Sequence, residues 1–153
     1  MTSWDDFTAG SPEIAAAGRR LIERSGIGEG LLATVRGDAP PRIHPVHVRI
    51  AGGRLLTFVI VGSAKADDLR ADGRYALHAH QDPAVPHEFL VRGRARQVTE
   101  PDARAAAAAD WSFEVDDGYE LYELSIDHAV FGERGSADDW PPVYTSWRPH
   151  PPA

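Results

Sequence analysis

Apolar and polar residues alternate one by one through much of the chain, and this period of two predicts β-strands. The clearest example is a segment in which Arg42 and His44 fall on the same side as Val46, with the intervening residues on the other side. The strands that the pattern predicts are Leu31–Val35, Arg42–Ile50, Leu55–Val61, Tyr75–His80, Glu88–Val98, Tyr119–Phe131 and Val143–Trp147.

Three segments have helical signals instead. Each begins with a capping residue: Ser11 ahead of a proline, Ser63 after a glycine, and Thr99 with an acid three residues later. The predicted helices lie between Ser11 and Gly26, over Ala64–Ala71, and from Pro101 to Ala109.

The order of these elements predicts a barrel. The Gly52-Gly53 pair is typical of a tight hairpin, and successive short strands indicate an antiparallel meander. Closing the sheet removes the exposed edges that a meander would leave. We therefore expect a mainly β fold, a small β-barrel of six to seven antiparallel strands with a few helices, and 153 residues leave room for one domain over 1–153.

Composition narrows the class of protein. With 42% hydrophobic and 25% charged residues the chain matches an ordinary globular domain. It has no cysteine, which excludes disulfides, thiolate metal sites and a cysteine nucleophile. The acidic N-terminus is unlike a secretory signal, and no apolar run is long enough for a membrane span. We expect a cytoplasmic protein.

The net charge of −7 argues against nucleic-acid binding, which requires an excess of Lys and Arg. The charge is uneven, because residues 102–139 hold 11 acids and two bases, whereas residues 30–98 hold ten bases and six acids. The basic middle of the chain is therefore suited to an anionic small molecule.

The strand Arg42–Ile50 carries the most chemistry. Arg42 and His44 continue the core-facing row, so cationic groups are expected at its end. Pro45 cannot donate a ladder hydrogen bond and predicts an edge or bulge, where the backbone is free to meet a ligand. A barrel rim with solvated charges is the alternative interpretation of the same residues.

A second candidate lies at the predicted helix start after Gly62. Free backbone N–H groups there form an anion site, and Lys65, the single lysine, adds a charge. An ordinary capped helix with an exposed lysine would have the same sequence. Because the hairpin returns the third strand beside the second, Ser63 and Lys65 are expected at the barrel end near Arg42.

Two further patterns have structural interpretations. Arg92, Arg94 and Arg96 share one strand face, which is typical of a solvated surface that pairs with acids. His78 and His80 also share a side and could bind a metal together with Asp82 or His87, but paired strand histidines more often line a polar barrel end. We therefore predict no metal site.

Taken in order, three segments resemble the pyridoxamine 5′-phosphate oxidase-like FMN-binding split barrels. They are Leu32–Val35 followed by Arg42-Ile43-His44-Pro45-Val46, then Phe58–Lys65 with Leu69 and Arg74-Tyr75 beyond it, and finally Val91–Ala95. The resemblance implies a homodimeric split β-barrel with two equivalent sites at the subunit interface, each binding FMN or the deazaflavin F420.

The resemblance also implies which residues contact the cofactor. They are Arg42, Ser63 and Lys65 on the phosphate, His44, Pro45 and Val46 along the isoalloxazine ring, His47 beside that ring, Phe58 and Val59 at the cofactor wall, and Glu88, which would repel a phosphate or contact a ring N–H. Ala64 departs from the pattern, because many FMN-binding members have a second cation there.

We therefore expect an FMN- or F420-dependent oxidoreductase that acts on a small molecule. The cofactor carries the hydride, so no side chain must act as acid or base; if one does, His44 or His47 is the candidate. A non-catalytic, cofactor- or small-molecule-binding split-barrel dimer is the alternative, favoured by Ala64. A metal hydrolase based on His78 and His80 ranks last.

Overall fold

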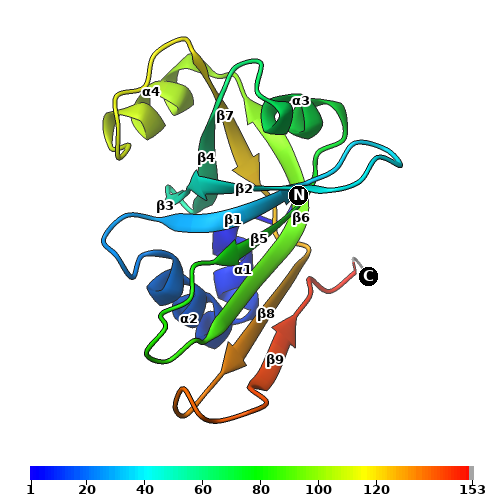
Figure 1. Ribbon diagram of the computed structural model, residues 1–153. Coiled ribbons are helices and arrows are strands. Elements are labelled where there is room, and N and C mark those ends of the chain that lie inside the picture. The colour runs from blue at the N-terminus through cyan, green and yellow to red at the C-terminus, as the bar shows by residue number, and fades with distance from the viewer. Residues whose placement is uncertain (152–153) are drawn as a thin grey trace.

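The computed structural model describes residues 1–151 as a curled antiparallel sheet with helices against it (Figure 1). The helices and strands, in chain order, are α1 (Trp4–Gly10), α2 (Pro12–Ile22), β1 (Glu29–Thr34), β2 (Arg42–His47), β3 (Arg49–Ala51), β4 (Arg54–Ile60), α3 (Ala64–Ala71), β5 (Arg74–Ala79), β6 (Glu88–Val98), α4 (Pro101–Ala109), β7 (Tyr119–Leu124), β8 (His128–Glu133) and β9 (Val143–Trp147). Helices α3 and α4 lie at one end of the sheet, and α2 and the β8–β9 pair at the other (Figure 1).

The sheet closes on itself through one strand that changes partners. The hydrogen-bonded order is β2-β1-β5-β6-β7-β4-β3, and β2 and β3 are two parts of one extended segment interrupted at Val48. The first part pairs with β1 and the second with β4. At the change, the N–H of Val48 donates to the carbonyl of Gly28 at 2.9 Å, and the Thr57 hydroxyl donates to the carbonyl of His47 at 2.8 Å. With β2 and β3 counted as one, the barrel has six strands, within the predicted number.

Strand β6 also has two sets of partners on one side. Its first half pairs with β8 and its last residues pair with β7. The chains cross closely at Gly93, where an added Cβ would clash with the carbonyl oxygen of Ser125. The segment predicted as one strand over Tyr119–Phe131 is therefore two strands, with Ser125–Asp127 between them, because each part pairs with a different half of β6.

Apolar side chains fill the barrel and the space beneath the N-terminal helices. Trp4 and Phe7 of α1 are almost fully buried, and their rings lie 5.1 Å apart in an edge-to-face arrangement. A second, smaller cluster lies under α4, where the ring of Phe58 meets that of Trp111 at 4.9 Å. Helix α1 was not predicted, because seven residues are too few to show a helical period.

The faces of the β2–β3 strand are those that the alternation predicts. Val46, Val48 and Ile50 are buried, whereas Ile43 and Pro45 are exposed. Within residues 1–151, no helix is both long and apolar enough to cross a membrane.

Replacing Val46 by aspartate should destabilise the barrel by about 3 kcal/mol or more, because an unpaired carboxylate would enter the core. Urea unfolding measures the change. Val143→Asp is the matched control, since Val143 is 71% exposed on β9, and its effect should stay within about 0.5 kcal/mol. Equal losses in the two variants would contradict the assignment of Val46 to the core.

Candidate functional site

Three cations gather at the start of α3, and we call Arg36, Arg42 and Lys65 the cation cluster. Arg42 begins β2, Arg36 follows β1, and Lys65 lies in the first turn of α3. Both arginines reach one carboxylate, that of Asp68, which lies one helical turn after Lys65. The structure thus brings Arg42 and Lys65 to one end of the barrel, where the hairpin register led us to expect them.

Asp68 is the buried centre of this arrangement, with a side chain only 1% exposed. Its Oδ2 accepts from the hydroxyl of Thr34 at 2.8 Å and from Nε of Arg42 at 3.1 Å. Nη2 of Arg36 lies 3.2 Å from Oδ1 without hydrogen-bond alignment. A buried carboxylate is tolerated when cations and donors surround it, so Asp68 holds both arginines in place.

No local pattern distinguishes Asp68 from its half-exposed neighbour Asp67. The register of the hairpin between β1 and β2 was the sequence signal that could have placed Thr34 in the site, because it sets Thr34 directly opposite Arg42. Thr34, Arg36 and Asp68 are therefore the members of the site that sequence reasoning missed.

His44 lies within the electrostatic reach of the same groups. Partial burial lowers the pKa of His44, the Lys65 and Arg42 charges lower it further, and Asp68 opposes them. The imidazole is therefore neutral at pH 7. Because the Thr34 hydroxyl already donates to Asp68, it can only accept from Nε2 of His44, 3.4 Å away, which leaves Nδ1 as the acceptor atom.

Ser63 caps α3 as predicted. Its hydroxyl accepts from the N–H of Ala66 at 3.3 Å and donates to the carbonyl of Ile60 at 2.7 Å. The N–H groups of Ala64 and Lys65, at the first two helical positions, have no carbonyl within the helix to donate to. The helix start therefore offers two backbone donors beside the Lys65 ammonium.

The outer face of β2 leads away from the cation cluster. Ile43 is 70% exposed, and Pro45 follows on the same exposed face. His47 is next in the row, where its Nδ1 lies 2.7 Å from the hydroxyl of Ser112 and its ring lies 5.6 Å from that of Phe113. The segment after α4 thus covers the far end of this face.

Val46, Phe58 and Val59 are not open to solvent in this chain. Val46 and Val59 face the barrel core, with exposed fractions of 7% and 1%. Phe58 points to the other face of β4, where Trp111 packs on it and the guanidinium of Arg104 lies 5.3 Å from its ring. These residues shape the wall beneath β2 and β4 without presenting a free surface.

Glu88 lies apart from the cation cluster. It begins β6 opposite Gly132 of β8, and its carboxylate accepts from the Tyr144 hydroxyl at 2.6 Å. The register of β1, β5 and β6 sets Gly93 level with Arg42, so Glu88 lies five residues further along the sheet. Within one chain it belongs to the opposite barrel end.

The candidate metal ligands have separate partners. Nδ1 of His78 lies 2.7 Å from the carbonyl of Ala79, and Nδ1 of His80 lies 3.3 Å from the carboxylate of Glu29. His87 accepts from the N–H of Arg134. In the described chain, no three His, Asp or Glu residues are gathered as metal ligands would be.

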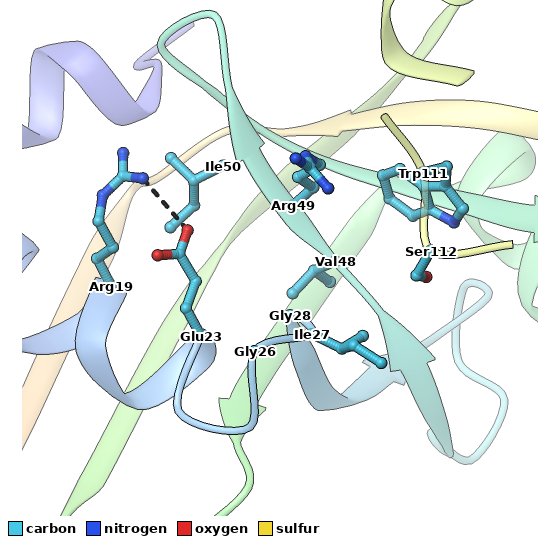
Figure 2. A pocket seen from close by; sticks show the side chains of 10 residues that line it. All are labelled: Arg19, Glu23, Gly26, Ile27, Gly28, Val48, Arg49, Ile50, Trp111 and Ser112. Carbon is cyan, nitrogen blue, oxygen red and sulfur yellow. Dashed lines mark hydrogen bonds and ion pairs between the residues drawn. The ribbon is translucent and has the colours of Figure 1, made fainter. Parts of the chain in front are cut away.

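A cavity of about 600 Å³ lies beside the point where β2 passes into β3. Figure 2 shows Arg19 of α2 and Glu23, the residue that caps this helix, on one side, ion-paired at 3.2 Å, and Trp111 on the other. Arg49 lies between them and donates to the carbonyl of Asp110. Because Arg49 shares the outer face of His47, the cavity continues the exposed row that starts at Ile43.

The electrostatic arrangement around His44 can be tested by NMR titration of its ring. Lys65→Ala should raise the pKa of His44, because a repelling charge is lost, whereas Asp68→Asn should lower it further. In the wild type, folding lowers the pKa, so this group's contribution to stability is present above the unfolded value near 6.5 and is lost as pH falls below it. Shifts of the same sign in both variants would rule out this arrangement.

Comparisons with known proteins give structural matches only. No family model matches the chain, and no curated protein matches its sequence. Among solved structures, a heme binding protein from Mycobacterium smegmatis has a TM-score of 0.63 at 17% identity over 87% of this chain, which spans only 57% of that protein. A candidate pyridoxamine 5′-phosphate oxidase from Listeria innocua has a TM-score of 0.57 at 14% identity, covering 72% of this chain and 91% of that one.

A third match covers nearly the whole of both chains. PhzG from Burkholderia lata 383, solved in complex with tetrahydrophenazine-1-carboxylic acid, has a TM-score of 0.59 at 12% identity over 95% of this chain and 96% of that one. The TM-scores of these matches establish a shared architecture, and the low sequence identities leave the activity open. The chain has the split-barrel fold of the pyridoxamine 5′-phosphate oxidase-like proteins.

Proposed function

We propose that the protein binds the phosphate of FMN, or alternatively of F420, at the cation cluster, and that it is a flavin- or deazaflavin-dependent oxidoreductase of a small molecule. The observation that carries the proposal is the gathering of Arg36, Arg42 and Lys65 at one helix start around a single buried carboxylate. Three cations against one anion leave a net charge of +2, which favours a phosphate dianion.

The residues present fit a phosphate group. Asp68 uses only Nε of Arg42, so the two Nη groups of that half-exposed side chain stay available as donors. The ammonium group of Lys65 has no ion-pair or hydrogen-bond partner within residues 1–151. The free N–H groups at the start of α3 add two donors, which offset the cation that Ala64 does not provide.

The remainder of the cofactor would follow the outer face of β2, past Ile43 and Pro45 toward His47. When bound, a flavin or deazaflavin supplies hydride transfer. The protein's part is to orient the ring, to exclude water and to place polar groups beside it. Neutral His44 can accept a proton at Nδ1, and its Nε2 hydrogen is fixed by Thr34.

A homodimer would complete this site. Leu31 and Ile43 are exposed apolar residues on the outer face of β1 and β2, and Leu31 lies opposite Pro45 in the register. We propose that a second copy of the chain covers this face, because burying it removes apolar surface from water and encloses the proposed ring site.

Non-catalytic binding of a cofactor or small molecule is the second candidate. The Ser63 hydroxyl is occupied by its helix cap and Phe58 is covered by Trp111, so fewer groups are free to contact a cofactor than the resemblance implies. Stopped-flow reduction separates the two functions. An enzyme would show transfer of reducing equivalents between the bound cofactor and an electron donor or acceptor, whereas a binding protein would leave the cofactor unreactive.

The first experiment is a visible spectrum of the purified protein with mass spectrometry of the released cofactor. Flavin or deazaflavin absorbance in stoichiometric amount is expected. A protein that stays colourless after incubation with FMN and with F420 would contradict the proposal, and a heme spectrum would replace it with a different cofactor.

Lys65→Ala should weaken FMN affinity by about 1.5–3 kcal/mol, or about 10- to 150-fold, because a charge-assisted hydrogen bond to the phosphate is lost. Quenching of flavin fluorescence measures the affinity. Lys65→Arg should recover most of it, and Arg20→Ala, an exposed cation on α2, should leave it unchanged. Unaltered binding by Lys65→Ala would exclude the cation cluster as the phosphate site.

A further inference from the structure

A second group of cations lies on the outer face of β6 and β8, away from the cation cluster. Arg92 of β6 stands directly opposite His128 of β8. Ala129 of β8 stands opposite Trp147, the last residue of β9, and Arg148, which follows directly, lies near His128. Arg92, His128 and Arg148 therefore form one row across three neighbouring segments, with a cross-strand spacing of about 5 Å between the Cβ atoms of Arg92 and His128.

A second row lies beside the first. Arg74 of β5 stands directly opposite Arg94 of β6. Asp72 neutralises Arg74, with its carboxylate 2.6 Å from Nε, whereas Arg94 reaches only the backbone carbonyl of Asp72 at 3.4 Å. Like charges directly opposite in a sheet repel each other, and here the Asp72 carboxylate compensates the charge of Arg74 while Arg94 keeps its own.

These residues line a shallow groove of about 280 Å³, which we call the arginine groove. Its lining holds the buried Tyr75 and, as charged residues and histidine, Arg74, Arg92, Arg94, Asp127, His128 and Arg148. In the described part of the chain, the guanidinium groups of Arg92 and Arg148 have neither an ion-pair nor a hydrogen-bond partner. Asp72 neutralises Arg74, and the Asp127 carboxylate offsets one of the other three arginines. The groove therefore keeps a net charge of +2 in a protein whose total charge is −7.

The groove is held in shape by buried neighbours. Trp147 packs against Phe7 of α1, with ring centroids 5.1 Å apart, and this contact holds the backbone next to Arg148 in place. The β6–β8 ladder fixes Arg92 and His128. The strand pattern predicts that Arg92, Arg94 and Arg96 alike are solvated and pair with acids. Of the three, only Arg96 pairs with acids in the described chain, with Glu123 at 3.1 Å and Glu100 at 3.4 Å.

We propose that the arginine groove binds a small molecule with a pyrophosphate or other multiply charged phosphate group, at a site separate from the proposed cofactor site. Guanidinium groups match phosphate oxygens in pairs, and three of them without carboxylate partners are suited to a group with more than one negative charge. The bound anion would relieve the repulsion among Arg92, Arg94 and Arg148. The proposal does not depend on the protein being an oxidoreductase.

His128 is a built-in reporter for this site. Partial burial lowers the pKa of His128, and the Arg148 and Arg92 charges lower it further. An anion bound between these arginines would screen them and raise the pKa. His44 reports independently on the cation cluster, so one NMR titration observes both sites.

The experiment is titration of the full chain with inorganic pyrophosphate at constant ionic strength, following the ring resonances of both histidines. We expect the pKa of His128 to rise with saturable binding, and Arg92→Gln and Arg148→Gln each to weaken that binding at least tenfold. Arg20→Gln is the matched control, because the exposed guanidinium of Arg20 also has no partner in the described chain, and this variant should bind pyrophosphate as the wild type does.

Each outcome decides one way. A His128 resonance that does not respond, or undiminished binding by Arg92→Gln and Arg148→Gln, overturns the proposal. Double-stranded DNA that shifts His128 at lower concentration than pyrophosphate also overturns it, in favour of a nucleic-acid surface. A response at His128 without one at His44 supports the arginine groove while counting against the proposed phosphate site of the cofactor.

Discussion

The barrel depends on one strand that hydrogen-bonds to two different neighbours. Residues 42–47 complete the ladder of β1, and residues 49–51 complete that of β4, with Val48 at the change of partner. The same strand carries Arg42, His44 and His47, so the hydrogen bonds that close the barrel also set the geometry of the candidate site. A shift of register that moved any of these side chains would also open the barrel.

The second constraint is electrostatic. Asp68 lies on the buried face of α3 and would be costly there without its partners, so Thr34, Arg36 and Arg42 stabilise the fold as well as the site. The same contacts determine the local charge, because the carboxylate cancels one cation and leaves the other two for a ligand. Folding thus orients the two arginines before any ligand arrives, which reduces the entropy that binding would lose.

Sequence alternation predicted the faces of β2 correctly because the period of two persists whichever neighbour a strand has. For the same reason it could not reveal the change of partner at Val48 or the break between β7 and β8, since hydrogen-bond partners leave no mark on the pattern. The meeting of Arg42 and Lys65 followed from the hairpin. The burial of Asp68 and the distance of Glu88 from the cation cluster depend on how several neighbouring strands align with one another. Local sequence patterns do not encode that alignment.

The contact between α1 and β9 has a consequence for the order of folding. Phe7 lies near the start of the chain, yet its ring is enclosed by Phe89 of β6 and Trp147 of β9. During synthesis the first helix therefore emerges long before the residues that shelter it. Until β9 has left the ribosome, Trp4 and Phe7 present aromatic surface that a chaperone or another nascent chain could capture.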